Sequence, residues 1–193
     1  MSDPTDLVRA RLGRELAQLR WSEICPRRFA TAALDDFAPM VSGPLAQWAT
    51  EPGGRNLVIC GPVGTGKTHA AFAAVQQLIF DGVDAAFWPV VELLDQLRPG
   101  GPDGVLERAM ECEVLVLDDL GAERVTDWTA ERLYAIVNRR WMAQRSIVAT
   151  TNHPNYSVLA EHVGERLASR LVTSETVVMR LTGDDKRRTP TKE

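Results

Sequence analysis

The sequence has no apolar run long enough to cross a membrane, no closely spaced cysteines and no excess of positive charge. No apolar run reaches the ~18 residues of a spanning helix, and residues 1–10 lack the charged-then-apolar order of a signal peptide. The 3 cysteines lie far apart and none has C-x-x-C spacing, so neither a zinc site nor a disulfide framework is indicated. These absences predict a soluble, cytoplasmic protein without a membrane partner.

The formal net charge of −4 excludes a surface coated in basic residues. Nonspecific affinity for DNA comes from neutralising phosphates, so any nucleic-acid surface must be local. An ordinary solvated face is the alternative at each basic position. The candidate positions are the pair Arg98 and Arg108, the helical set Arg132, Arg139, Arg140 and Arg145, and the tail segment 186–188.

Residues 61–68 are the most informative segment that is present. They read Gly61-Pro62-Val63-Gly64-Thr65-Gly66-Lys67-Thr68, between an apolar run at 56–60 and a helix-compatible stretch that begins at His69. Strand, loop and helix are the context of a phosphate-binding P-loop, whose glycines let backbone N–H groups and the helix N-terminus face the phosphates. Lys67 supplies charge for the β and γ phosphates, and the Thr68 hydroxyl is a natural Mg²⁺ ligand. We therefore predict that residues 61–69 bind a nucleoside triphosphate with Mg²⁺.

Polar side chains follow two further apolar segments. Residues 114–117 run into Asp118 and Asp119, and residues 146–151 run into Asn152. In a doubly wound sheet the carboxyl ends of the strands border the ligand crevice. We predict that Asp118 is a water-mediated partner of Mg²⁺, that Asp119 orients or polarises the attacking water, and that Asn152 contacts the γ-phosphate. A turn-forming role is the alternative for Asn152.

Helical stretches separate the expected strands, which predicts an α/β fold with a mainly parallel sheet and helices on both faces. The expected strands are 56–60, 84–88, 113–118, 146–151 and 176–180, and the expected helices are 69–80, 90–97, 105–110, 127–144 and 157–171. A length of 193 residues fits one such domain.

Residues 1–35 are predicted to be an N-terminal helix and linker arm. Apolar residues recur at helical spacing over residues 6–19, and the resulting stripe could dock on the rest of the chain or on a partner. Residues 24–39 are predicted to be an extended linker. Phe29 and Phe37 in this linker could contact adenine, with core packing as the alternative. The stripe consists of Val8, Leu12, Leu16 and Leu19.

The segments GPVGTGKT, VLVLDDLGAE, IVATTN and GERLASRL together resemble the AAA+ ATPases of the DnaC and IstB type, which are replicative-helicase loaders and transposition helpers. The resemblance implies that residues 36–183 form a P-loop AAA+ ATPase domain with a five-stranded parallel sheet of order 5-1-4-3-2. It also implies a homo-oligomer that holds ATP at its subunit interfaces. Because the chain ends soon after Arg180, we expect a charged tail at 184–193 and no separate lid domain.

The resemblance further implies an arginine finger that serves the neighbouring subunit. The finger maps by motif to Arg170, with Arg166 as its rival, and Arg187 is the candidate for a second sensor arginine. Residues 90–110 correspond in position to the insert that lines a single-stranded DNA channel in this clade, which makes Arg98 and Arg108 candidate DNA contacts. The clade usually has Asp at the position of Asp119, and we expect slow, assembly-dependent hydrolysis of ATP.

The leading hypothesis is an ATP-dependent loader that assembles on single-stranded DNA and recruits or loads a replicative helicase. An IstB-like transposition helper that acts on duplex DNA is the alternative within the family. A small P-loop kinase and a nonhydrolysing DNA-binding adaptor are the alternatives from other classes. Preference for single-stranded or duplex DNA distinguishes the first two hypotheses. Absence of ATP hydrolysis would distinguish the adaptor from the ATPases.

Overall fold

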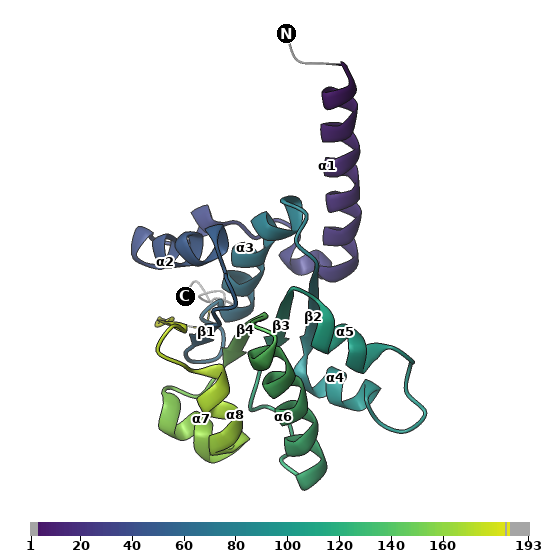
Figure 1. The fold of residues 1–193 in the computed structure, drawn as a ribbon. Coiled ribbons are helices and arrows are strands. Elements are labelled where there is room, and N and C mark those ends of the chain that lie inside the picture. Colours follow the sequence, from purple (N-terminus) through teal and green to yellow (C-terminus); the bar gives the residue numbers. More distant parts are fainter. Residues whose placement is uncertain (1–3, 184, 186–193) are drawn as a thin grey trace, which may run out of the picture.

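The computed structural model of the chain describes residues 4–183 and 185, with side chains from residue 12 onward. Its centre is a five-stranded sheet of order β2-β3-β4-β1-β5, in which all neighbouring strands pair in parallel (Figure 1). Read from the other edge, this is the predicted order, so the predicted sheet is confirmed. The strands are β1 (Leu57–Cys60), β2 (Ala85–Pro89), β3 (Val114–Asp118), β4 (Ser146–Thr151) and β5 (Val177–Arg180).

Apolar side chains of the strands contribute to two hydrophobic cores, one on each face of the sheet, because successive residues of a strand point to opposite faces. Leu57 and Ile59 of β1 belong to one core, and Val58 belongs to the other. Burial on both faces is the reason that β1 and residues 114–117 are wholly apolar. The first core also contains residues of α2 (Pro39–Thr50) and α3 (Lys67–Phe80). The second contains residues of α4 (Val90–Gln96), α5 (Val105–Glu111), α6 (Asp127–Met142), α7 (Tyr156–Val163) and α8 (Glu165–Leu171).

The first helix, α1 (Pro4–Ile24), is longer than predicted, and its C-terminal part packs on the body. Trp21 is buried, and its ring meets Phe72 of α3 edge-on at 5.9 Å between centroids. Leu12, Leu16 and Leu19 remain 53%, 57% and 59% exposed. The N-terminal part of α1 extends away from the sheet (Figure 1). Docking of these three leucines on the rest of the described chain is therefore wrong, and Val8, the fourth residue of the stripe, lies outside the described side chains.

The predicted extended linker at 24–39 is also wrong. This segment contains the end of α1 and two 3₁₀ turns, Arg27–Phe29 and Leu34–Asp36. In the second turn, Asp36 Oδ2 accepts a hydrogen bond from the N–H of Ala33 at 2.9 Å. The expected helices do not include α2, and Pro39 at its first position reads as a helix breaker. Pro39, however, occupies the first turn, where proline is tolerated, and Trp48 is fully buried.

The single helix predicted at 157–171 is two helices. Gly164, with φ +89° and ψ +140°, ends α7 and begins α8, and this conformation suits glycine. In the described part of the chain, no helix has both the length and the apolar character needed to cross a membrane.

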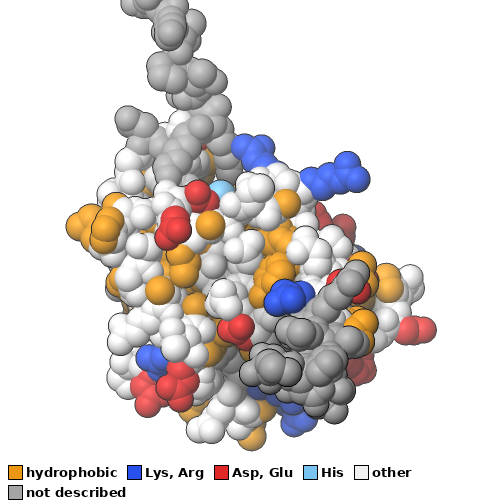
Figure 2. All heavy atoms as spheres, turned by 90° about the horizontal axis from the view of Figure 1, so that it is seen from above, with side chains coloured by type: hydrophobic (Ala, Val, Ile, Leu, Met, Phe, Trp, Pro, Cys, Tyr) orange, Lys and Arg blue, Asp and Glu red, His pale blue; other side chains and the backbone are white. Residues whose placement is uncertain are grey.

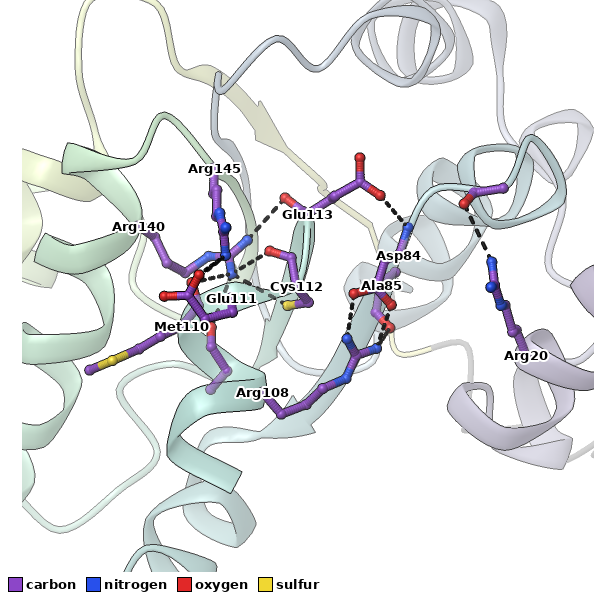
Figure 3. A network of polar contacts seen from close by, with 12 residues as sticks. Arg20, Asp84, Ala85, Arg108, Met110, Glu111, Cys112, Glu113, Arg140 and Arg145 are labelled. Carbon is purple, nitrogen blue, oxygen red and sulfur yellow. Dashed lines mark hydrogen bonds and ion pairs between the residues drawn. The ribbon is translucent and has the colours of Figure 1, made fainter. Parts of the chain in front are cut away.

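Arg140 of α6 is fully buried and is neither a solvated side chain nor a nucleic-acid contact. Its Nη1 donates to the carbonyl oxygen of Cys112 at 2.8 Å, and its Nη2 donates to that of Glu113 at 3.1 Å (Figure 3). Nη1 also donates to the carbonyl oxygen of Ala109 at 3.0 Å, and Nη2 to that of Ser146 at 2.7 Å. Burial lowers the pKa of Arg140 from its usual value, and the carbonyl dipoles replace the lost hydration. The side chain thereby joins α5, α6 and the starts of β3 and β4.

Replacing Arg140 with leucine should lower the free energy of unfolding by about 3 kcal/mol, because several buried carbonyl groups lose their donor. Urea denaturation followed by circular dichroism measures the change. The matched control is Arg139→Leu, since the Arg139 side chain is 60% exposed and pairs with Glu111 at 3.1 Å. We expect this control to change stability by no more than ~0.5 kcal/mol. Equal losses in the two variants would contradict the structural role of Arg140.

Candidate functional site

The P-loop connects β1 to α3 and depends on glycine at its bends. Gly66 is the N-cap residue of α3, with φ +95° and ψ +21°, a left-handed conformation that residues with a Cβ rarely adopt. At Gly61 a Cβ would lie 2.1 Å from the carbonyl oxygen of Leu181, so only glycine fits. The loop therefore brings the N–H groups at the start of α3 to one place, which is an anion-binding arrangement.

Lys67 is buried, and its ammonium group crosses the P-loop. Its Nζ donates to the carbonyl oxygen of Pro62 at 2.8 Å and to Oδ1 of Asn152 at 2.7 Å. The second bond joins the P-loop to the end of β4, which pairs with β1. The structure thus brings together two predicted site residues, as a contact of both with one phosphate group requires.

A chain of hydrogen bonds links Thr68, Asp118 and Thr150. The hydroxyls of Thr68 and Thr150 donate to Asp118 Oδ1 at 2.9 and 2.6 Å, respectively. Burial raises the pKa of Asp118, and the charge of Asp119 adds to this rise, whereas the two hydroxyls oppose it. Hydroxyl and carboxylate oxygens are hard ligands that suit Mg²⁺, so the predicted pair Thr68 and Asp118 fits this ion.

Asp119 leaves β3 in a left-handed conformation, with φ +55°. Such a φ is uncommon for residues with a Cβ, although aspartate tolerates it better than most. The Asp119 N–H donates to Thr150 Oγ1 at 2.9 Å, which holds the turn. As a result, the two adjacent carboxylates have different surroundings: Asp118 is buried against Thr68, and Asp119 lines the cavity beside the P-loop.

This cavity has a volume of about 440 Å³. His69, which follows the P-loop motif, lies in its wall with Nε2 2.6 Å from Asp36 Oδ2. The rings of Phe29 and Phe37 lie 6.3 and 5.6 Å from the His69 ring, and both also pack against the first core. Core packing and a place in the cavity wall are therefore compatible for both phenylalanines. The lining residues are Arg28, Phe29, Thr31, Asp36, Phe37, Val63, Gly64, Gly66, Lys67, Thr68, His69, Asp119 and Asn152.

The predicted finger, Arg170, lies away from this cavity. Its backbone carbonyl accepts a hydrogen bond from Asn56 Nδ2 at 3.3 Å. Asn56 immediately precedes β1, whereas the P-loop follows β1, and an extended segment of this length spans roughly 16 Å. Arg166, one turn earlier in α8, is exposed. Within one copy of the chain, neither arginine lines the nucleotide cavity.

The candidate DNA contacts have different surroundings. Both terminal nitrogens of Arg108 bind the carboxylate of Asp84, at 2.5 and 2.8 Å (Figure 3). Arg98 instead lies over the ring of Trp128, 5.5 Å from its centroid, and Arg132 meets the same ring at 6.0 Å. The structure therefore groups Arg98 with Arg132 rather than with Arg108. On the face shown in Figure 2, basic side chains stand singly or in small groups among acidic ones.

Sequence reasoning missed three residues of the site. Thr150 donates to the Asp118 carboxylate and accepts the backbone N–H of Asp119, and its signal was the Thr-Thr-Asn run at the end of β4. Asp36 binds His69 from a segment predicted to be extended. The chain after β5 also returns to the P-loop, where the Asp185 carboxylate lies 1.8 Å from the place of a Cβ on Gly64. No local pattern indicated the last two contacts, because each joins distant parts of the chain. Arg187 and the tail segment 186–188 lie outside the described residues.

The P-loop at the start of α3, the Thr68–Asp118 pair and the strand order together define a P-loop NTPase fold of the AAA+ class. Residues 45–187 match the family model described as IstB-like ATP binding protein. The chain belongs to this family, which confirms the family resemblance. ATP is accordingly the nucleotide that this family assigns to the site.

The chain is similar to proteins of bacteria and of mobile elements. It is 33% identical over 124 residues to the uncharacterized protein YdaV of Escherichia coli (62% of this chain, 50% of that protein). It is 33% identical over 135 residues to the putative ATP-binding protein Rv3427c in insertion sequence of Mycobacterium tuberculosis (65% and 54%). The chain thus spans about half the length of these curated relatives.

Among solved structures, the crystal structure of the DnaC helicase loader matches with a TM-score of 0.73 and 26% sequence identity. The match covers 81% of this chain and 100% of that chain. Together with the sheet order, this similarity confirms the predicted AAA+ fold.

Replacing Lys67 with alanine should weaken ATP binding by roughly 100-fold, because a charge-assisted contact with the phosphates is lost. The fold should survive, since the ammonium group bonds to the P-loop and Asn152 and contributes nothing to the two apolar cores. Titration with a fluorescent ATP analogue measures affinity, and thermal unfolding checks the fold. Asp119→Asn is the control that should keep its affinity. A folded Lys67→Ala protein with parental affinity would refute the assignment of the site.

Proposed function

We propose that this protein is an ATP-dependent helicase loader, which assembles on single-stranded DNA and recruits or loads a replicative helicase. The observation that carries the proposal is that the predicted ATP-site residues and the predicted arginine finger lie at opposite edges of the sheet. The P-loop, Asp118, Asp119 and Asn152 lie at the carboxyl ends of the strands, while Arg170 lies beside the residue that precedes β1. An arginine so placed can reach ATP only on another copy, which supports a homo-oligomer with sites at its interfaces.

Each residue of the cavity has a role in this proposal. Lys67 and the P-loop N–H groups bind the phosphates, and Asn152 faces the γ-phosphate together with Lys67. Asp119, exposed to the cavity, accepts a hydrogen bond from the attacking water and orients it. Thr68 and Asp118 would hold Mg²⁺, directly and through water, and the bound ion would neutralise phosphate charge. Phe29 and Phe37 border the part of the cavity that would receive the adenine ring.

The single-stranded DNA contact is assigned to the group formed by Arg98, Trp128 and Arg132. Trp128 packs against the second core, and both arginines contact its ring, so the ring holds them in place. The two arginines would neutralise phosphates of a single strand without sequence preference. Arg98 uses only Nε for its ion pair with Asp95, at 3.1 Å, so its terminal nitrogens have no hydrogen-bond partner among the described residues. Arg108, by contrast, is saturated by Asp84 and by the carbonyl of Ala85. Arg98 is therefore the stronger of the two predicted DNA contacts.

A transposition helper acting on duplex DNA is the second candidate. It is favoured by the family match and by the insertion-sequence origin of the relative from Mycobacterium tuberculosis. Both candidates share the ATP site and the interface finger, so the nature of the DNA and of the recruited protein distinguishes them.

Two inactive variants should restore activity to one another if ATP sites are shared between copies. Asp119→Asn should bind ATP without hydrolysing it. Arg170→Ala should lose about a thousandfold in turnover, because negative charge that develops on the phosphate in the transition state is no longer stabilised. A mixture contains interfaces with an intact Asp119 from one chain and an intact Arg170 from the other. Phosphate release should therefore recover partly on mixing.

Arg166→Ala is the matched control, since Arg166 lies on the same helix and is exposed. It should hydrolyse ATP at the parental rate. Mixed assemblies of Asp119→Asn and Arg170→Ala that stay as inactive as either variant alone would exclude Arg170 as the finger.

The loader hypothesis predicts preferential binding to single-stranded DNA in the presence of ATP. Arg98→Ala should weaken this binding. It should also reduce the slope of log affinity against log salt concentration by roughly one, because one phosphate contact is lost. Arg108→Ala should leave the slope unchanged. Fluorescence anisotropy at several salt concentrations, with single-stranded and duplex oligonucleotides of one length, measures both effects.

Co-capture of a purified replicative helicase, with and without ATP, then tests recruitment. Preference for duplex DNA together with failure to retain the helicase would favour the transposition helper over the loader.

A further inference from the structure

One face of α6 presents Tyr134, Asn138 and Trp141, which stand four and three positions apart and so lie along the same side of the helix. Arg170 of the neighbouring helix α8 lies across this face. Its guanidinium carbon is 5.4 Å from the centroid of the Tyr134 ring and 5.1 Å from that of the Trp141 ring, and its Nε donates to Asn138 Oδ1 at 2.5 Å. We call Tyr134, Asn138 and Trp141 the α6 clamp.

The clamp holds the inner part of the guanidinium and leaves its outer part available. Asn138 takes the Nε hydrogen, whereas Nη1 and Nη2 have no hydrogen-bond acceptor among the described residues. Arg140, by contrast, uses both terminal nitrogens on carbonyl groups inside the fold. The two outer nitrogens of Arg170 are the fork that binds a phosphate with two hydrogen bonds.

The orientation of the Asn138 side chain is set by a second contact. Its Nδ2 donates to the sulfur of Met142 at 3.7 Å, which leaves Oδ1 for Arg170. Trp141 remains 50% exposed and Met142 70% exposed at the end of α6. The clamp therefore lies at the surface of the edge that carries Arg170, where a second copy of the chain has access.

We propose that Tyr134, Asn138 and Trp141 are positioning residues, which hold Arg170 in the conformation in which it meets the phosphate of ATP on a neighbouring copy. This inference rests on the proposed role of Arg170 as the finger. A long arginine side chain loses rotamer freedom when it binds, and a clamp that restricts it beforehand reduces this loss at assembly. The two aromatic faces attract the cation without occupying its hydrogen-bond donors.

A purely structural role, in which the clamp only packs α8 on α6, predicts different effects. Loss of packing would lower stability whether or not Arg170 is present. Loss of positioning would lower turnover at saturating ATP, would leave KM for ATP unchanged because the clamp is remote from the cavity, and would have no effect once Arg170 is gone.

Steady-state ATP hydrolysis by Trp141→Ala and Asn138→Ala tests the proposal. We expect kcat to fall by roughly ten- to a hundredfold in each variant, as misplacement of a positioned group does, with KM and the thermal midpoint close to the parental values. Trp141→Phe retains an aromatic face and should recover most of the activity. Tyr156→Ala is the control, since Tyr156 is an aromatic residue outside the clamp that bonds to Glu165 and not to Arg170. It should hydrolyse ATP at the parental rate.

Two further experiments distinguish the role of the α6 clamp from that of Arg170 itself. Trp141→Ala should add no loss to Arg170→Ala in the double variant, because the ring acts through the arginine. Mixing Trp141→Ala with Asp119→Asn should raise turnover above that of either variant alone, since the two defects lie on opposite sides of the interface. Parental kcat in both clamp variants, with Arg170→Ala inactive, would overturn the clamp and leave the finger intact. Parental turnover in Arg170→Ala would overturn the finger and the clamp together.

Discussion

Parallel pairing of β1 with β4 and β5 is the constraint on which the ATP site depends. Parallel strands all end at the same edge of a sheet, so the P-loop after β1, Asn152 after β4 and Asp118 at the end of β3 converge although they are far apart in the chain. The bonds from Lys67 to Asn152 and from Thr68 to Asp118 exist because of this convergence. Burial of the sheet on both faces keeps these strand ends in register.

The same constraint separates the site from the arginine proposed to complete it. The chain crosses back from each strand end before it enters the next strand, and Arg170 lies on the return segment before β5. That placement puts it beside Asn56, at the edge where the strands begin. In the proposed mechanism, Arg170 completes an ATP site at the opposite edge of the sheet, and a second copy brings the two together. Assembly and hydrolysis are thereby coupled in the proposed mechanism.

Four arginines show how the surroundings of a side chain decide its use. Arg140 is buried and bonds to carbonyl groups, so it stabilises the fold. Arg108 is paired with Asp84 through both terminal nitrogens. Arg170 and Arg98 are held beside aromatic rings, and their terminal nitrogens have no hydrogen-bond partner among the described residues. The first two have structural partners, and the last two are the arginines that we propose to bind phosphate.

The sequence by itself determined the strand pattern, the P-loop and the polar strand ends, because these features are local: apolar runs, glycine spacing and adjacent acids occupy neighbouring positions in the chain. The strand order and the family came from the resemblance carried by those same motifs. The conformation of residues 24–39 and the existence of α2 were decided by packing on α3, although Pro26 and Pro39 read as breakers. The break at Gly164, the role of Thr150, the burial of Arg140 and the α6 clamp likewise required the tertiary structure. Each of these four depends on backbone geometry or on side chains of different elements, and no local pattern records what the fold places next to a residue.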